Sequence, residues 1–116
     1  MAAITIFHNP NCGTSRNVLA QLREAGRSHE VVEYLKAGWT KPQLKDLLAK
    51  MGAKPRDVLR VRGTPAEELG LTRPNVSDDV ILEAMTRHPI LVERPIVVSG
   101  AKAALCRPAD KVREFL

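Results

Sequence analysis

One cysteine of this sequence stands where its thiol could act as a nucleophile. Cys12 follows the turn-forming segment Asn9-Pro10-Asn11, which comes after a predicted strand, and it lies at the start of a predicted helix. The unpaired N–H groups and the dipole of a helix start stabilise negative charge and lower the pKa of a thiol placed there. Because the thiolate is the nucleophilic form, this position favours a reactive cysteine over a small buried side chain. We expect the nearby His8 and Arg16 to favour the thiolate as well.

The residues after Cys12 supply no second thiol. Cys12-Gly13-Thr14-Ser15 has the Cys-x-x-Ser form, in which a hydroxyl stands where a dithiol motif has its resolving cysteine. An adduct on Cys12 must therefore be resolved by an external thiol, unless Cys106 approaches it. Two roles are open to Ser15: it caps the helix, or it donates a hydrogen bond to the thiolate.

Three arginines lie at predicted element boundaries. Arg94 and Arg107 each precede a proline, and Arg60 lies beside a predicted turn. A guanidinium offers a rigid fork of donors that matches the oxygens of a tetrahedral oxyanion, so three of them converging on one thiolate would form an oxyanion pocket. The alternative is that each is a solvated surface side chain. In the phosphate-binding loop of tyrosine phosphatases, five residues separate the cysteine from an arginine. Only three residues separate Cys12 from Arg16, so this loop is absent.

Composition narrows the class of protein. The 116 residues are 44% hydrophobic and 27% charged, which is typical of one globular domain. The 18 Lys and Arg exceed the 13 Asp and Glu and give a net charge of +5. The basic residues form no long run and only 3% of the residues are aromatic, so no nucleic-acid partner is expected. His29 and His88 lack metal-ligand spacing, and we predict no metal and no other bound cofactor.

Neither a membrane span nor a targeting segment is predicted. No run approaches the ~18 consecutive apolar residues that a span needs, and Met1-Ala2-Ala3-Ile4 leads directly into a strand-like segment rather than a signal peptide. We therefore expect a cytoplasmic protein with no membrane partner. In that reducing compartment, Cys12 and Cys106 are expected to be free thiols.

A strand, a helix and a second strand are predicted in the first 35 residues. Ile4–Phe7 is β-branched and aromatic and predicts the first strand. The helix begins between Cys12 and Ser15 and stops at Gly26. Its apolar stripe consists of Val18, Leu19, Leu22 and Ala25. Val31–Leu35 predicts the second strand, and two strands joined through one helix form a right-handed parallel βαβ unit.

Residues 40 to about 88 are predicted to be mostly helical. Thr40 and Gln43 form a capping box ahead of the first helix of this block. Its apolar stripe comprises Leu44, Leu47, Leu48 and Met51, and Gly52 ends it. Later helical starts are marked by Pro55, Thr64-Pro65 and Ser77.

The end of the chain returns to strand patterning. Pro95–Val98 and Ala103–Cys106 flank the turn Ser99–Lys102 and predict a β-hairpin. Pro108 at the first helical position opens a final helix, with Val112, Phe115 and Leu116 on its apolar side. The order β-α-β, helical block, β-β-α predicts one α/β domain over residues 1–116, with a helical insertion at about 40–88.

Three segments resemble the glutaredoxin-coupled arsenate reductase (ArsC) family. His8–Asn17 is similar to the active-site segment of that family. His88–Val98 and Leu105–Pro108 are similar to its two later segments, in the same order and at similar separation. The resemblance spans essentially the whole chain and implies a thioredoxin-like, glutaredoxin-like fold enlarged by a helical insertion.

The resemblance also implies roles for individual residues. Cys12 is the nucleophile that attacks arsenate, and the oxyanion is bound by Arg60, Arg94 and Arg107. His8 and Ser15 support the thiolate, and Pro95 occupies the cis-proline position of the family. Cys106 is not expected to be catalytic. Glutathione is the implied co-substrate and glutaredoxin the implied partner, which together reduce the adduct to arsenite.

Two other functions are open to the same scaffold. One is a glutathione-dependent thiol oxidoreductase, which would turn over disulfides and not arsenate. The other is a non-enzymatic regulator of the Spx type that binds RNA polymerase. Spx proteins typically carry Cys-x-x-Cys, whereas position 15 here is serine.

Overall fold

The computed structural model describes residues 3–116, in two compact units. One unit contains the residues up to Ala37 together with Arg94–Leu116, and the other contains Gly38–Glu93. The second unit includes the segment predicted as a helical insertion. That residues 1–116 act as one domain stays a prediction. Met1 and Ala2, which the sequence analysis placed ahead of the first strand, lie outside the described residues.

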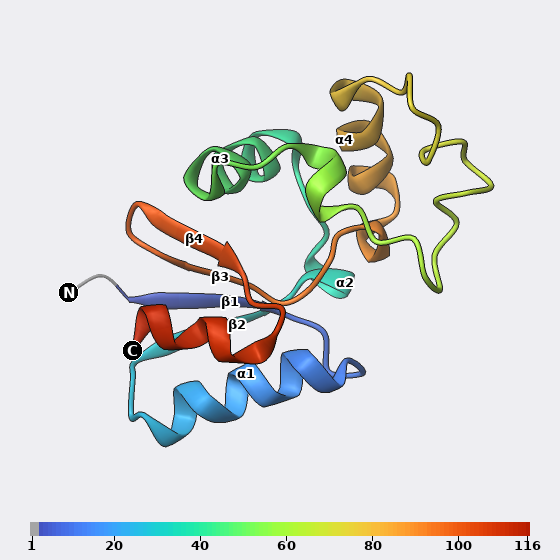
Figure 1. The fold of residues 1–116 in the computed structure, drawn as a ribbon. Coiled ribbons are helices and arrows are strands. Elements are labelled where there is room, and N and C mark those ends of the chain that lie inside the picture. The colour runs from blue at the N-terminus through green and yellow to red at the C-terminus, as the bar shows by residue number, and fades with distance from the viewer. Residues whose placement is uncertain (1–2) are drawn as a thin grey trace. The chain divides into compact units, whose positions relative to one another are not determined.

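A four-stranded mixed sheet forms the centre of the first unit (Figure 1). Its strands are β1 (Ile4–His8), β2 (His29–Glu33), β3 (Ile96–Ser99) and β4 (Lys102–Leu105), in the order β2-β1-β3-β4. β1 pairs in parallel with β2 and antiparallel with β3, and β3 pairs antiparallel with β4. The predicted βαβ unit, the hairpin and the α/β class are therefore confirmed.

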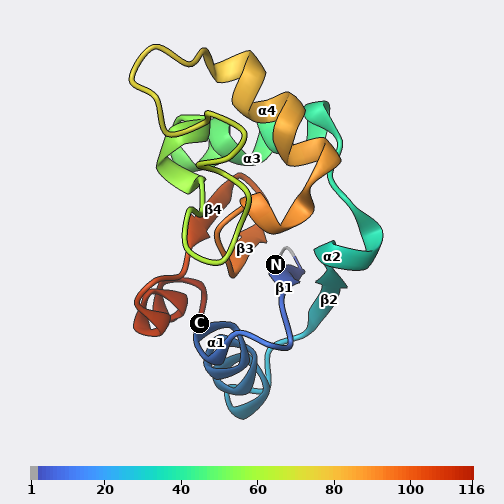
Figure 2. The ribbon, with the colours of Figure 1, turned by 90° about the vertical axis from the view of Figure 1, so that its right-hand side faces the viewer.

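Two helices cover one face of this sheet. α1 (Gly13–Glu24) and the 3₁₀ helix η3 (Ala109–Phe115) lie side by side (Figures 1 and 2). Alternate residues of a strand lie on one face of the sheet, and residues three or four apart lie on one face of a helix. Apolar side chains from both faces therefore pack into one core. Its buried members are Ile4, Ile6, Val18, Leu19, Leu22, Val97, Cys106, Val112 and Phe115.

Two predicted boundaries in this unit were wrong. β2 ends at Glu33, and the next four residues form the short helix α2 (Tyr34–Ala37). The final helix begins after Pro108, whose backbone is extended, and Leu116 is 45% exposed rather than buried. A 3₁₀ helix has three residues per turn, so Val112 and Phe115 share its buried face and the next residue turns away.

The second unit is built from helices. α3 (Lys41–Met51) has the predicted capping box, in which the Gln43 N–H donates to Thr40 Oγ1 over 3.2 Å. η1 (Pro55–Val58), α4 (Asp78–Arg87) and η2 (Pro89–Leu91) follow along the chain. No helix within residues 3–116 is long and apolar enough to cross a membrane.

The helix predicted from Thr64-Pro65 does not form. Thr64 does cap a turn, since its hydroxyl accepts the Ala66 N–H, and the Leu69 N–H bonds to the Pro65 carbonyl over 3.0 Å. Gly70 then adopts a left-handed φ of 74°, and the chain turns away after one helical turn. A glycine in this conformation ends a helix, which limits this one to a single turn. Residues 59–77 therefore contain turns, bends and an isolated bridge at Leu59, but no helix.

Candidate active site

Cys12 caps the amino end of α1 with an extended backbone conformation. Its N–H donates to the Asn9 carbonyl over 3.0 Å, and its own carbonyl accepts the Arg16 N–H, also over 3.0 Å. The Asn9 side chain accepts the Asn11 N–H and holds the turn between strand and helix. These bonds fix the thiol at the helix start. Cys12 is only 8% exposed.

Two of the three predicted arginines lie at this thiol. The Nη1 of Arg107 is 3.7 Å from Cys12 Sγ and also donates to the Arg94 carbonyl over 2.9 Å. The Nε and Nη1 of Arg94 are buried and have no hydrogen-bond partner among the described residues. Buried donors without partners are costly. An oxyanion bound beside Cys12 would satisfy them.

The β-hairpin brings these two arginines together. β3 and β4 pair Ile96 with Leu105, and the same register continued two residues further places Arg94 opposite Arg107. The Cys106 N–H donates to the Pro95 carbonyl over 2.9 Å and joins the two segments. Both the Arg94–Pro95 bond and the Arg107–Pro108 bond are cis. The second of these cis bonds was not predicted from the sequence.

The pKa of Cys12 reflects opposing effects. Burial raises it, but hydrogen bonds from the Ser15 backbone N–H and from the Arg94 and Arg107 side chains lower it, as does the positive charge of Arg94. The net result is a pKa below the ordinary value of a cysteine. Cys12 is therefore a thiolate over a wider pH range than a free thiol.

His8 and Ser15 form a buried pair behind the cysteine loop. The Nδ1 of His8 is 2.6 Å from Ser15 Oγ, which also accepts the Asn9 N–H over 3.1 Å. Burial, followed by the charges of Arg23 and Arg16, lowers the pKa of His8 and outweighs the opposing effect of Glu33. The His8 ring and the Ser15 hydroxyl share one hydrogen bond, and the tautomer of the ring decides which of the two donates. The Ser15 side chain thus holds the loop, and its backbone N–H acts on the thiol.

Arg60 belongs to the second unit. Its Nη1 pairs with Glu93 Oε1 at 2.9 Å, and its Nε donates to the Arg62 carbonyl over 3.1 Å. That Arg60 joins Arg94 and Arg107 at Cys12 stays a prediction. Sequence reasoning did not single out Glu93, although its place directly before Arg94 was a signal that an acid accompanies the arginines.

Comparison with known proteins identifies the family. The model of the ArsC family matches residues 7–115. This chain belongs to the ArsC family. It is 50% identical over 113 residues to the arsenate reductase ArsI2 of Synechocystis sp., covering 97% of this chain and 81% of that protein. It is 45% identical to the arsenate reductase of Escherichia coli K12, covering 100% of this chain and 82% of that protein.

A solved ArsC structure has the same fold. The arsenate reductase from Vibrio cholerae superposes with a TM-score of 0.93 at 37% identity, over 99% of this chain and 98% of that one. The thioredoxin-like fold predicted for this ArsC-family chain is therefore confirmed.

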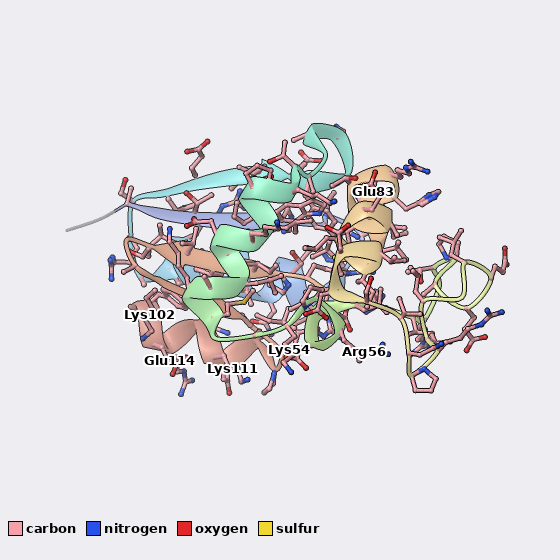
Figure 3. The ribbon with its side chains drawn as sticks, turned by 90° about the horizontal axis from the view of Figure 1, so that it is seen from above. Lys54, Arg56, Glu83, Lys102, Lys111 and Glu114 are labelled. Carbon is pink, nitrogen blue, oxygen red and sulfur yellow. The ribbon has the colours of Figure 1, made fainter. Side chains whose placement is uncertain are left out.

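The second cysteine of this ArsC-family chain lies in a different environment. Cys106 is fully buried in the core under α1 and η3. Burial and then the charge of Glu114 raise its pKa to about 12, with a smaller opposing effect from Lys111 (Figure 3 shows both residues on η3). Both cysteines are free thiols. Within residues 3–116, no group of His, Cys, Asp and Glu side chains could hold a metal ion.

Proposed function

We propose that this chain is an arsenate reductase in which the Cys12 thiolate attacks arsenate. The observation that carries the proposal is the placement of Arg107 Nη1 at 3.7 Å from Cys12 Sγ, beside the unpartnered Nε and Nη1 of Arg94. A thiolate surrounded by guanidinium donors suits a tetrahedral oxyanion that must be both bound and attacked. The arsenate reductases to which the chain is similar support this substrate.

The first step forms a covalent adduct. The Cys12 sulfur attacks arsenic, an As–S bond forms, and one arsenate oxygen leaves as water after taking up protons. The arginine donors stabilise the negative charge that collects on the remaining oxygens during this exchange. We assign Arg94, Arg107 and also Arg60 to this role.

The second step needs an external thiol. Position 15 is serine, and the Cys106 thiol is buried with a pKa raised to about 12, so neither provides a resolving thiolate. A glutathione thiolate attacks the Cys12 sulfur, an S–S bond forms, and the As–S electron pair stays on arsenic. Arsenic is thereby reduced from As(V) to As(III) and leaves as arsenite. Glutaredoxin then attacks the glutathione sulfur of the mixed disulfide and releases the Cys12 thiolate.

A coupled assay tests this function. Arsenite formation is followed with glutathione and glutaredoxin present, and again with glutaredoxin omitted. We expect turnover only with the full system. A parallel assay offers a glutathione mixed disulfide in place of arsenate. Turnover of that disulfide without any arsenate reduction would replace the proposal with a general thiol oxidoreductase.

A further inference from the structure

Arg60 is held by three separate interactions within the second unit. Its backbone N–H donates to the Leu91 carbonyl over 2.7 Å, and its Nε donates to the Arg62 carbonyl over 3.1 Å. Its Nη1 pairs with Glu93 Oε1 at 2.9 Å. No hydrogen bond within residues 3–116 uses Nη2. Two of the three guanidinium nitrogens are therefore bonded, and only Nη2 is left without a hydrogen bond among the described residues.

The backbone on both sides of this ion pair is also fixed. Leu59 and Val92 form an antiparallel bridge, and the Glu93 N–H donates to the Val58 carbonyl over 2.8 Å. The two side chains of the pair are only 18% and 23% exposed. By contrast, the exposed fractions in the helical pair of Lys50 and Asp46 are 29% and 64%. A shielded ion pair is less screened by solvent and constrains its side chains more than a surface pair does.

Glu93 is also joined by a peptide bond to Arg94, whose side chain acts on Cys12. The Cα atoms of consecutive residues are about 3.8 Å apart. The carboxylate that holds Arg60 is thus one residue along the chain from an arginine of the thiolate site.

We propose that Glu93 is a positioning residue that orients the Arg60 guanidinium for the oxyanion. The proposal rests on the proposed function, in which Arg60 binds arsenate. Glu93 fixes Nη1 and leaves Nη2 open for an oxyanion oxygen, so the pair persists while substrate binds. If the Glu93 carboxylate instead had to leave Arg60 before arsenate could bind, it would compete with the substrate. Removing Glu93 should raise the KM for arsenate if the carboxylate positions Arg60, and lower it if the carboxylate competes.

The test compares Glu93→Ala, Glu93→Gln, Arg60→Ala and the double variant Glu93→Ala/Arg60→Ala in the coupled assay. We expect Glu93→Ala to raise the KM for arsenate by about tenfold, in line with the loss of a charge-assisted hydrogen bond, with kcat changed far less. Glu93→Gln keeps an acceptor oxygen and should recover most of that loss. The double variant should be no worse than Arg60→Ala, because Glu93 acts only through Arg60.

Two controls separate positioning from damage to the fold. Asp46→Asn removes the exposed carboxylate of the α3 pair and should leave KM unchanged. The pH profile of Cys12 alkylation reports the thiolate site and should be the same in Glu93→Ala as in the parent.

Each outcome decides the proposal. An unchanged or lower KM in Glu93→Ala overturns it, as does a loss in the double variant beyond that of Arg60→Ala. If Arg60→Ala keeps the parent KM, the assignment of Arg60 in the proposed function fails and the role of Glu93 fails with it. If only Arg60→Ala loses affinity, the oxyanion role of Arg60 stands and the role of Glu93 does not.

Discussion

The two cysteines of this chain are both buried, but the pKa values of their thiols are shifted in opposite directions. Cys12 is 8% exposed and Cys106 is fully buried. Burial raises the pKa of both thiols, yet the pKa of Cys12 is lowered overall, whereas that of Cys106 is raised to about 12. The difference lies in the donors around each sulfur. Cys12 has the Ser15 backbone N–H and two guanidiniums, while the Cys106 thiol donates weakly to the Ala104 carbonyl.

This contrast indicates that the hydrogen-bond donors around each sulfur, rather than its exposure, set the direction in which the thiol pKa is shifted. Desolvation disfavours the thiolate at both sites, and only specific donors reverse that effect. The same unit can therefore hold one thiol with a lowered pKa and one with a raised pKa.

Replacing each cysteine in turn should have very different effects on activity. Cys12→Ser should abolish arsenate reduction, because a hydroxyl neither ionises near neutral pH nor accepts thiol exchange. Cys106→Ser should keep activity within a few-fold of the parent, since its thiol takes no part in any step. Arsenite formation in the coupled assay measures both. Parent-like turnover by Cys12→Ser would remove Cys12 from the mechanism.

Removing Arg107, whose Nη1 lies 3.7 Å from Cys12 Sγ, should make that site resemble the site of Cys106. Arg107→Ala should lower kcat/KM by about 30- to 1000-fold, corresponding to ~2–4 kcal/mol for lost donors to the oxyanion or transition state. It should also raise the pKa of Cys12. Arg107→Lys keeps the positive charge but loses the paired donors of the guanidinium, so its kcat/KM should lie between those of the parent and of Arg107→Ala.

The exposed Arg113 on η3 offers a matched control for this prediction. Arg113→Ala removes the same charge from the chain and should change kcat/KM little. If Arg107→Ala were as active as Arg113→Ala, the guanidinium at 3.7 Å from the thiol would have no catalytic role.

The raised pKa of Cys106 also predicts how stability depends on pH. Folding favours the protonated thiol, so this contribution is complete below the unfolded pKa of ~8.5 and is lost as pH rises toward about 12. The stability advantage of the parent over Cys106→Ala should therefore shrink by about 2 kcal/mol between pH 7 and pH 10. Chemical unfolding of both proteins at the two pH values measures it. A constant difference would mean that the folded chain does not resist ionisation of Cys106.

Much of the fold could be predicted because the periodicities are strong. The strand pattern of Ile4–Phe7 and the capping box at Thr40 each specify one local structure, and the structure contains both. The helix predicted from Thr64-Pro65 failed because a cap signals where a helix starts and says little about its length. Gly70 ended it within one turn.

The site was less accessible to sequence reasoning. Arg94 and Arg107 lie at equal distances from the predicted Ser99–Lys102 turn, so an antiparallel hairpin brings them together. The lowered pKa of His8 and its bond to Ser15 depend on burial, which the sequence does not report. For Ser15, the sequence left capping and thiolate donation open, and the hydroxyl bonds instead to His8 and Asn9.

Donors at the start of α1 and on the hairpin should make Cys12 the more reactive of the two thiols. Alkylation by iodoacetamide, followed at each cysteine by mass spectrometry across a pH series, tests it in one experiment on the folded protein. The midpoint for Cys12 should lie below ~8.5, the value of a free cysteine, and Cys106 should not be alkylated over the same pH range. A Cys12 midpoint at or above ~8.5, or equal alkylation of the two cysteines, would contradict it.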